Sequence, residues 1–379
     1  MQKRIRLISV GIVLIVLLIG IIVINNNSNS KYSFTQDGIK YALTLDGNKI
    51  TSFPSKGMYK AQVTCVGADG KWLYDEWKLA IENITSDDVT CDIKFETIPK
   101  TNLNDYIISL LESEQGIGKV VNENGYRYEG KNPNNYIWFN NEYWRIIGVF
   151  DSASHGVSGK NLVKIIRADV LDGLAWDKSN TSDWTASSLK SLLNGAYYNA
   201  QDGTSSGYCY GYSTTATANC DYTKRGIQAG YRGMIAGVTW HLGGYSSASA
   251  TSSAFYGYER GTTVYSGRPT STTGYIGLMY PSDYGYSVLS SNCARTTNLG
   301  SYSSATCAGQ SWLYGKGYEW TLTPRSSYDS NVFILGYYGD LSYNNARVGY
   351  GSRPVLYLDA SVYKIDGDGS LKNPYIVGM

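Results

Sequence analysis

Residues 320–359 read WTLTPRSSYDSNVFILGYYGDLSYNNARVGYGSRPVLYLD, and this stretch decides the interpretation of the whole chain. Short runs of alternating apolar residues open and close it, as expected of two framework strands. Between them, 17 of the 27 residues at positions 326–352 are Tyr, Asn, Ser or Gly. Tyr offers a large amphipathic contact surface at low entropic cost, and the other three offer adaptable hydrogen bonding. The composition therefore predicts a ligand-contacting surface held up by two strands.

The predicted ligand-contacting residues are the tyrosines of this stretch and the charged and amide side chains near them. They are Tyr328, Asp329, Tyr337, Tyr338, Asp340, Tyr343, Asn344, Asn345, Arg347 and Tyr350. Aromatic faces beside amides and carboxylates suit either a glycan or a protein surface. Gly- and Tyr-rich segments can also form solvated hairpins whose rings only cover neighbouring strands, so a structural stalk without a specific ligand is the alternative. Arg353, which precedes Pro354, is expected to belong to the framework.

The chain of 379 residues is long enough for an anchor and two or three folded units. It holds 35 Tyr and 42 Gly against only 7 Phe, an excess that favours β structure and surface aromatics. Its 33 basic residues nearly balance 31 acidic ones, and three of the bases lie within residues 1–30, which contain no acid. The remaining chain has no basic block to bind a phosphate backbone, so nucleic-acid binding is not expected.

The six cysteines form three pairs of sequence neighbours: Cys65 with Cys91, Cys209 with Cys220, and Cys293 with Cys307. An even number in separate pairs is typical of structural disulfides in an oxidising compartment, although spacing alone does not fix the connectivity. No pair has the C-x-x-C spacing of a zinc ribbon or a thioredoxin-like site. We therefore expect three disulfides and an extracellular location, with no metal and no cofactor.

Residues 7–24, LISVGIVLIVLLIGIIVI, contain no charge over 18 positions, which is just long enough for a helix to span a bilayer. Basic residues precede this run and the polar NNNSNS follows it, so the positive-inside rule places Met1 in the cytoplasm and the later residues outside. A cleaved signal peptide is the alternative, but the run is long for one and no A-x-A-like site follows. Residues 1–30 are thus predicted to form a cytoplasmic tip, a single-pass anchor and a linker in the cell membrane.

Within residues 31–99, apolar and polar residues alternate with the period of two that is typical of strands with one buried face. Alternate residues from Tyr59 to Cys65 share one face of a strand, and alternate residues from Val89 to Phe95 share a face of another. This pattern predicts a small Ig-like β-sandwich, pinned across its core by the first cysteine pair and acting as a stalk.

Two further segments complete the predicted organisation. Leu and Ile recur at helical spacing over residues 101–115, which predicts a connector helix within residues 100–119. Residues 120–379 mix short strands, a helix after Asp183 and a loop-rich region over residues 201–317. So much irregular chain in a compact domain indicates stapling by the last two cysteine pairs.

Four motifs carry a resemblance to known proteins: YIWFNNEYWRIIGVF at 136–150, DGLAWD at 172–177, WTASSLKSLLNG at 184–195 and SRPVLYLD at 352–359. Together they resemble a family of uncharacterised bacterial surface domains. That family is similar in turn to the C-type-lectin-like fold of formylglycine-generating enzymes and of the variable proteins of diversity-generating retroelements. The resemblance covers roughly residues 122–379. It implies that the first and last strands pair, so that residues 138–149 lie beside residues 354–358.

The predicted fold class is therefore α+β: an N-terminal membrane helix, a small all-β sandwich, and a loop-rich C-type-lectin-like α+β domain with disulfides. The resemblance also implies a hypothesis about residues 326–352. In retroelement-diversified receptors the variable positions lie just before the last strand, and adenine-directed mutation of Asn codons yields Tyr, Ser, Asp, Gly, Ile and Phe. The stretch has that spectrum, so we hypothesise that it is diversified.

Few side chains offer catalytic chemistry. His155 and His241 are the two histidines, too few for a His-rich metal cluster, and no G-x-S-x-G, H-E-x-x-H or P-loop motif is present. Asp366 and Asp368 in DGDGS resemble the opening of a calcium loop, but Val377 stands where a bidentate Glu is required, which favours a hairpin turn. No motif matches the reactive cysteine pair of a formylglycine-generating enzyme, so such an oxidase is the less favoured alternative. We expect a non-enzymatic, membrane-anchored extracellular binding or adhesion protein that recognises a glycan or a protein.

Overall fold

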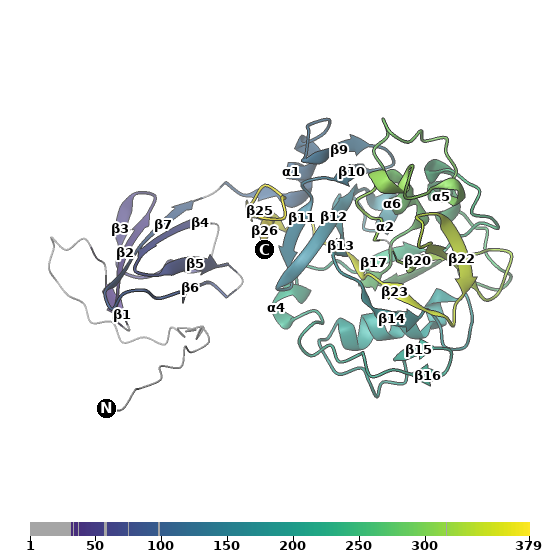
Figure 1. Ribbon diagram of the computed structural model, residues 1–379, viewed down its shortest axis with the longest axis horizontal. Helices are drawn as coiled ribbons and strands as arrows, with labels where there is room; N and C mark the ends of the chain where they lie inside the picture. The colour runs from purple at the N-terminus through teal and green to yellow at the C-terminus, as the bar shows by residue number, and fades with distance from the viewer. Residues whose placement is uncertain are drawn as a thin grey trace, which may run out of the picture. The chain divides into compact units, whose positions relative to one another are not determined.

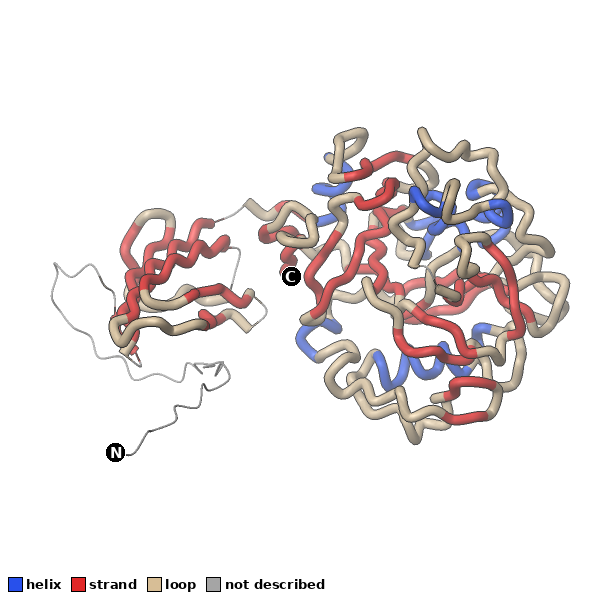
Figure 2. The backbone as a smooth tube through the Cα atoms, in the orientation of Figure 1, coloured by secondary structure: helices blue, strands red, loops and turns tan. Residues whose placement is uncertain are grey.

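The computed structural model describes residues 32, 34–36, 38–56, 59–74, 76–97, 99–315 and 317–379. The chain divides into two compact units, Met1–Lys100 and Thr101–Met379, which Figure 1 shows with their helices and strands. Strands make up 40% of the structure and helices 14%, and Figure 2 shows the strands in red outweighing the helices in blue. The protein is mostly β, so the α+β class expected from the sequence is wrong.

The first unit is built from a sheet and a hairpin. Its described strands are β1 (Phe34–Gln36), β2 (Ile39–Leu45), β3 (Asn48–Ile50), β4 (Tyr59–Val66), β5 (Asp69–Leu73), β6 (Lys78–Glu82) and β7 (Val89–Thr97). The five-stranded sheet has the order β1-β2-β7-β4, with β3 also on β2. β2 and β7 run parallel, and the other pairs are antiparallel. β5 and β6 form a separate antiparallel hairpin.

The core of the first unit lies between the sheet and this hairpin. Alternate residues of β7 from Val89 to Phe95 are buried, as the sequence pattern predicted. Trp72, Leu79 and Ile81 of the hairpin join the same buried cluster. The hairpin therefore covers one face of the sheet, and its Trp72 side chain fills part of the small core.

Cys65 and Cys91 form a disulfide between directly opposite residues of β4 and β7, with Cα atoms 4.1 Å apart. The bond thus joins neighbouring strands of one sheet, and the expectation that it pins the unit across its core is wrong. Gly70 of β5 lies against it: a Cβ atom at Gly70 would lie 2.4 Å from Cys65 Sγ and 2.7 Å from Val63 Cγ1. A glycine lets the hairpin approach the sheet this closely.

Replacing Gly70 with valine is expected to destabilise the first unit by about 1–3 kcal/mol, because the added carbons must push the hairpin away from the disulfide. Hydrogen–deuterium exchange of the β4 and β7 amides measures this change as a loss of protection. Lys71→Ala, at the exposed neighbouring position, is the matched control and should leave protection unchanged. Full protection in the Gly70→Val variant would contradict the close packing.

The second unit contains a ten-stranded and a five-stranded sheet. Its described strands are β8 (Thr101–Asn102), β9 (Ile117–Asn122), β10 (Tyr126–Asn132), β11 (Tyr136–Phe139), β12 (Glu142–Phe150), β13 (Leu162–Arg167), β14 (Leu171–Ala175), β15 (Tyr210–Tyr212), β16 (Thr215–Ala216), β17 (Val238–His241), β18 (Ser271–Gly274), β19 (Ile276–Gly277), β20 (Glu319–Pro324), β21 (Asn331–Leu335), β22 (Leu341–Asn345), β23 (Gly349–Ser352), β24 (Val355–Leu358), β25 (Tyr363–Asp366) and β26 (Tyr375–Gly378). The larger sheet has the order β19-β24-β13-β12-β11-β26-β25-β8, with β10 on β12 and β9 on β10. The smaller sheet has the order β14-β23-β20-β21-β22.

Short helices connect these strands. They are α1 (Leu103–Ser109), α2 (Ser152–His155), α3 (Ser188–Leu192), α4 (Ala229–Arg232), α5 (Ser252–Glu259) and α6 (Pro281–Tyr286). Each has eight residues or fewer, so little of the chain is helical, which is the physical reason that the α+β prediction failed. The helix predicted over residues 101–115 is shorter in the structure and belongs to the second unit, where β8 pairs with β25 just before it.

Several local predictions for the second unit hold. Asn140 and Asn141 have φ of 58° and 59° and form the two-residue turn between β11 and β12. The remaining disulfides join Cys209 to Cys220 and Cys293 to Cys307. All six cysteines are thus paired with their sequence neighbours. Three disulfides indicate an extracellular or secreted protein.

The strand pairing that the resemblance implied is wrong. β13 lies between β12 and β24, because Ile165 pairs with Ile146 on one side and with Leu356 on the other. Residues 138–149 and 354–358 are therefore not neighbours. The last strand, β26, pairs instead with β11 in parallel, with Trp138 opposite Ile376.

The membrane anchor predicted for residues 7–24 lies outside the residues that the structure describes. Within the described residues, no helix is long and apolar enough to cross a bilayer. The buried core of the second unit includes Trp144, Trp176, Trp240 and Trp320.

Candidate functional site

The predicted recognition residues lie in the turns on either side of β21, on β22, and on or just before β23. Three of them, Tyr337, Tyr338 and Asp340, lie in the turn of residues 336–340 that joins β21 to β22. Val332 to Leu335 of β21 are buried in the core, and this packing fixes the position of the strand. The turn is held by two phenol donors: Tyr284 Oη donates to Gly339 O at 2.6 Å, and Tyr314 Oη donates to Tyr337 O at 2.7 Å. The backbone that carries the surface is therefore anchored to the core.

Four tyrosines of the predicted set project into solvent. The exposed fractions of Tyr328, Tyr337, Tyr338 and Tyr343 are 49%, 52%, 68% and 39%. Tyr350 is half-buried. These rings are not folded away beneath neighbouring strands, as rings that merely cover a sheet would be.

The tyrosines of this region form two groups. The first group, called the turn cluster, consists of Tyr318, Tyr337, Tyr338 and Tyr350. The ring centroid of Tyr318 lies 5.2 Å from that of Tyr350, in a stacked arrangement, and 6.4 Å from that of Tyr337. Tyr337 and Tyr338 meet edge to face at 5.3 Å. Trp320 lies 5.0 Å from Tyr350 and is buried. The cluster is thus a continuous aromatic surface on a buried base.

That base is fixed by hydrogen bonds and by a buried ion pair. Trp320 Nε1 donates to Leu174 O at 2.8 Å. Arg353 Nε donates to Glu319 Oε2 at 2.7 Å, and Arg353 Nη2 donates to Leu313 O at 2.7 Å. Burial raises the pKa of Glu319, and Arg353 opposes this effect. Arg353 is buried in the framework, as its position before Pro354 predicted.

Tyr318 is a member of the cluster that the sequence did not reveal, because it lies outside residues 326–352. The parallel pairing of β20 with β23 places Glu319 opposite Gly351, and Gly351 N donates to Tyr318 O at 3.0 Å. This pairing brings Tyr318, which is 48% exposed, beside Tyr350. Its only sequence signal is its position next to the first framework strand.

The second group consists of Arg325, Tyr328 and Tyr343. The Arg325 guanidinium carbon lies 4.3 Å from the ring centroid of Tyr328 and 3.8 Å from that of Tyr343. Arg325 Nε also donates to Ser246 O at 2.7 Å. The two rings are therefore already engaged by a cation, which leaves them less free for a ligand than the turn cluster.

The predicted amides mostly bond within the surface. Asn344 Nδ2 donates to Tyr350 Oη at 2.5 Å, and Asn344 Oδ1 accepts from Asn345 N at 2.8 Å. Asn345 Oδ1 accepts from Asn331 Nδ2 at 3.4 Å. Asn344 and Asn345 thus orient Tyr350 and join β21 to β22 rather than standing free for a partner.

The predicted charged residues are not brought together. Asp340 lies in the turn beside the cluster and is half-buried. Asp329 and Arg347 are exposed and border residues 180–182 instead, because Ser182 N donates to Asp329 O and Arg347 N donates to Asn180 Oδ1. Of the ten predicted residues, the structure gathers Tyr337, Tyr338 and Tyr350 into one surface.

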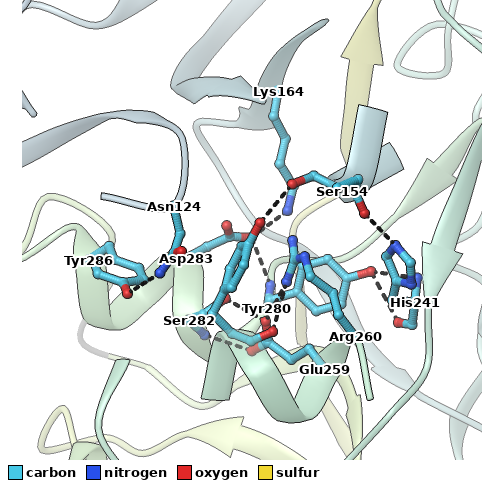
Figure 3. Close-up of polar contacts among 12 residues, drawn as sticks. Asn124, Ser154, Lys164, His241, Glu259, Arg260, Tyr280, Ser282, Asp283 and Tyr286 are labelled. Carbon is cyan, nitrogen blue, oxygen red and sulfur yellow. Dashed lines mark hydrogen bonds and ion pairs between the residues drawn. The ribbon is translucent and has the colours of Figure 1, made fainter. Parts of the chain in front are cut away.

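A second concentration of polar side chains lies inside the unit (Figure 3). Asp283 of α6 accepts from Arg127 Nη1 at 3.0 Å and from Lys164 Nζ at 2.5 Å, and all three side chains are 1% exposed. Tyr280 N donates to Asp283 Oδ2 at 2.9 Å and so caps the helix. Burial alone would raise the pKa of Asp283, but Lys164 and Arg127 outweigh it and hold the pKa below its ordinary value. Burial lowers the pKa of Lys164 to about 8 against the opposing effect of Asp283.

Glu259, at the end of α5, lies next to this group. Ser282 N and Ser282 Oγ donate to its two carboxyl oxygens at 2.9 Å and 2.5 Å, and Arg260 Nη1 lies 3.3 Å from it. Burial raises the pKa of Glu259 to about 7. These charged groups, which come from distant parts of the sequence, bond chiefly to one another, as in a structural network.

The histidines are held in place by backbone groups. His155 Nδ1 accepts from Val157 N at 3.2 Å and Nε2 donates to Phe150 O at 3.1 Å, which fixes a neutral tautomer. Burial lowers the pKa of His155 and that of His241, whose Nε2 contacts Ala153 O at 3.1 Å. A cavity of about 370 Å³ beside His155 is lined by Gly, Val, Thr and Tyr residues but by no acid, Lys or Arg. The cavity and the buried charges are therefore separate features.

Within the described part of the chain, no three His, Cys, Asp or Glu side chains are grouped so that they could hold a metal ion. Asp368 Oδ1 accepts from Ser370 N at 2.9 Å in the turn between β25 and β26, where the sequence favoured a hairpin. All six cysteines are in disulfides. Comparison with known proteins gives no match: no family model fits the chain, and no curated protein or solved structure matches it.

Proposed function

We propose that the protein is an extracellular binding or adhesion protein that recognises its ligand through the turn cluster, without enzymatic chemistry. The observation that carries this proposal is the exposure of Tyr337 and Tyr338, at 52% and 68%, on a turn anchored to the core, with Tyr318, 48% exposed and directly before β20, beside them. Exposed aromatic residues on a rigid base lose little entropy when they bind, which favours affinity. Such a group of rings is costly to leave in water, which supports a role in contact.

The proposed location of this surface is outside a cell membrane, to which residues 7–24 anchor the chain as a single-pass helix with Met1 in the cytoplasm. The three disulfides support an oxidising environment for the rest of the chain. The first unit would then act as a stalk for the second.

The proposed ligand is a glycan or a protein surface. Tyr rings can stack on the apolar face of a sugar or fill a shallow protein pocket, and the Asp340 carboxylate in the same turn can accept hydrogen bonds from a ligand. The proposed diversification of residues 326–352 would change which ligand is bound, and the DNA around these codons would then have an adenine-rich near-copy close by.

A binding screen on arrays of immobilised glycans and extracellular proteins tests the proposed function. The Tyr337→Ala/Tyr338→Ala variant is expected to lose at least about 2 kcal/mol of binding free energy to any ligand found, roughly thirtyfold in Kd, because both exposed rings are removed. The folded structure should persist, since neither ring is buried.

Tyr143→Ala/Tyr275→Ala is the matched control, because these two tyrosines are 37% and 41% exposed and lie on β12 and directly before β19, strands of the larger sheet rather than of the smaller sheet that carries the turn cluster. It should bind like the wild type. A ligand held equally by the wild type and the Tyr337→Ala/Tyr338→Ala variant would contradict the assignment of the turn cluster. The absence of any ligand on both arrays would favour a structural stalk.

A further inference from the structure

We propose that Lys164 and Asp283 condense to an isopeptide bond that joins β13 covalently to α6. The two side chains come from positions 119 residues apart, meet at 2.5 Å and are both 1% exposed. This proposal concerns the inner framework of the second unit and does not depend on the ligand-binding role of the turn cluster.

The site brings an amine and a carboxyl group together in a fixed geometry. Lys164 pairs with Gly148 on one side and Tyr357 on the other, so its backbone lies in the interior of the larger sheet. Asp283 is fixed by the helix cap that it forms with Tyr280 N. Groups fixed in this way react as if at effective concentrations of about 10⁵–10⁸ M, which lowers the barrier to bond formation between them.

Aromatic rings exclude water from the amine. The centroids of Tyr280, Phe150, Tyr357 and Trp240 lie 4.4, 5.6, 5.7 and 5.8 Å from Lys164 Nζ. Little water can therefore reach the pair to hydrolyse an amide once it forms. The same burial lowers the pKa of Lys164 to about 8, so the neutral, nucleophilic amine is accessible near neutral pH.

Two donors polarise the carboxyl group. Arg127 Nη1 donates to Asp283 Oδ1 at 3.0 Å, and Tyr280 N donates to Oδ2 at 2.9 Å. Arg127, on Oδ1, is placed to stabilise the negative oxygen of a tetrahedral intermediate, and Tyr280 N holds Oδ2, the oxygen that leaves. The two donors also favour the ionised carboxylate, so the reaction starts from the ion pair. A proton must then pass from the Lys164 ammonium group to the Asp283 carboxylate before the amine can attack.

The step balances without a co-reactant. Lys164 Nζ forms a bond to Asp283 Cγ, and the bond between Cγ and Oδ2 breaks. Oδ2 takes two protons from the ammonium group, with which it already shares a hydrogen bond, and leaves as water. The amide nitrogen keeps the third proton. A buried ion pair is thereby replaced by a neutral amide, which removes two charges from a low-dielectric interior.

Mass spectrometry of the reduced, denatured full chain tests the proposal. The expected mass is that of the sequence minus one water molecule, and digestion is expected to give a branched peptide that contains Lys164 and Asp283. An unmodified mass would overturn the proposal. So would a water loss located at an Asp–Gly pair such as Asp366–Gly367, where a succinimide forms instead.

Two variants sharpen this test. Lys164→Met lacks the amine and is expected to keep its full sequence mass. Asp283→Asn is expected to form the same amide with ammonia as the leaving group, so its final mass should equal that of the linked wild type. If either variant fails to fold, the branched peptide of the wild type still decides the question.

Discussion

Replacing Asp283 with alanine is expected to lower the free energy of unfolding of the second unit by about 3–5 kcal/mol, because removing one partner of a buried charge group leaves the others uncompensated. Arg127 and Lys164 are each 1% exposed and both contact this single carboxylate. The substitution also removes the acceptor for Tyr280 N at the start of α6. The loss is expected whether the pair with Lys164 is ionic or covalently joined.

Urea denaturation of the wild type and the variant at neutral pH measures this difference. Asp340→Ala is the matched control, since Asp340 is a half-buried carboxylate in a turn of the same unit and has no ion-pair partner among the described residues. It should cost well under 1 kcal/mol. A loss at Asp283 no larger than that at Asp340 would show that the buried charges do not depend on this carboxylate.

Local patterns in the sequence predicted local structure well. The alternation from Val89 to Phe95 predicted the buried face of β7, and Asn140 and Asn141 predicted the turn between β11 and β12. These signals involve residues whose conformation depends mainly on near neighbours. The disulfides were predictable for a related reason, because each cysteine bonds to its sequence neighbour.

The pairing of distant strands could not be predicted in this way. β13 lies between β12 and β24, although residue spacing gives no signal for the order of strands across a sheet. The resemblance therefore placed two strands side by side that the structure separates. The same limit explains why Tyr318 was missed, since only the parallel pairing of β20 with β23 brings it beside Tyr350.

The buried charges show this limit most clearly. Arg127, Lys164 and Asp283 are separated by up to 156 residues, and each resembles an ordinary surface charge in the sequence. The tyrosine-rich stretch of residues 326–352 differs from these buried charges, because its composition alone indicates exposed aromatic residues. Its exposed rings could be predicted, but their division between the turn cluster and Arg325 depends on contacts from outside the stretch.

The contribution of Glu259 to the stability of the second unit is expected to fall as the pH rises from about 4.5 to about 7. Burial raises the pKa of this carboxyl group from an ordinary value of 4.5 to about 7 in the folded protein. Below pH 4.5 both the folded and the unfolded chain hold the proton. Between the two values the unfolded chain has released it while the folded chain still binds it, so folding becomes less favourable as the pH rises.

The Glu259→Gln variant removes this titration but keeps a side chain of similar shape that can bond to Ser282. Relative to the wild type, its free energy of unfolding is expected to rise by about 3 kcal/mol between pH 4.5 and pH 8, as follows from a pKa shift of this size. Denaturation curves at several pH values measure the difference. The raised pKa values of Glu129 and Glu319 and the lowered pKa values of His155 and His241 act in both proteins and largely cancel in the difference. A difference independent of pH would mean that Arg260, 3.3 Å away, keeps Glu259 ionised throughout this range.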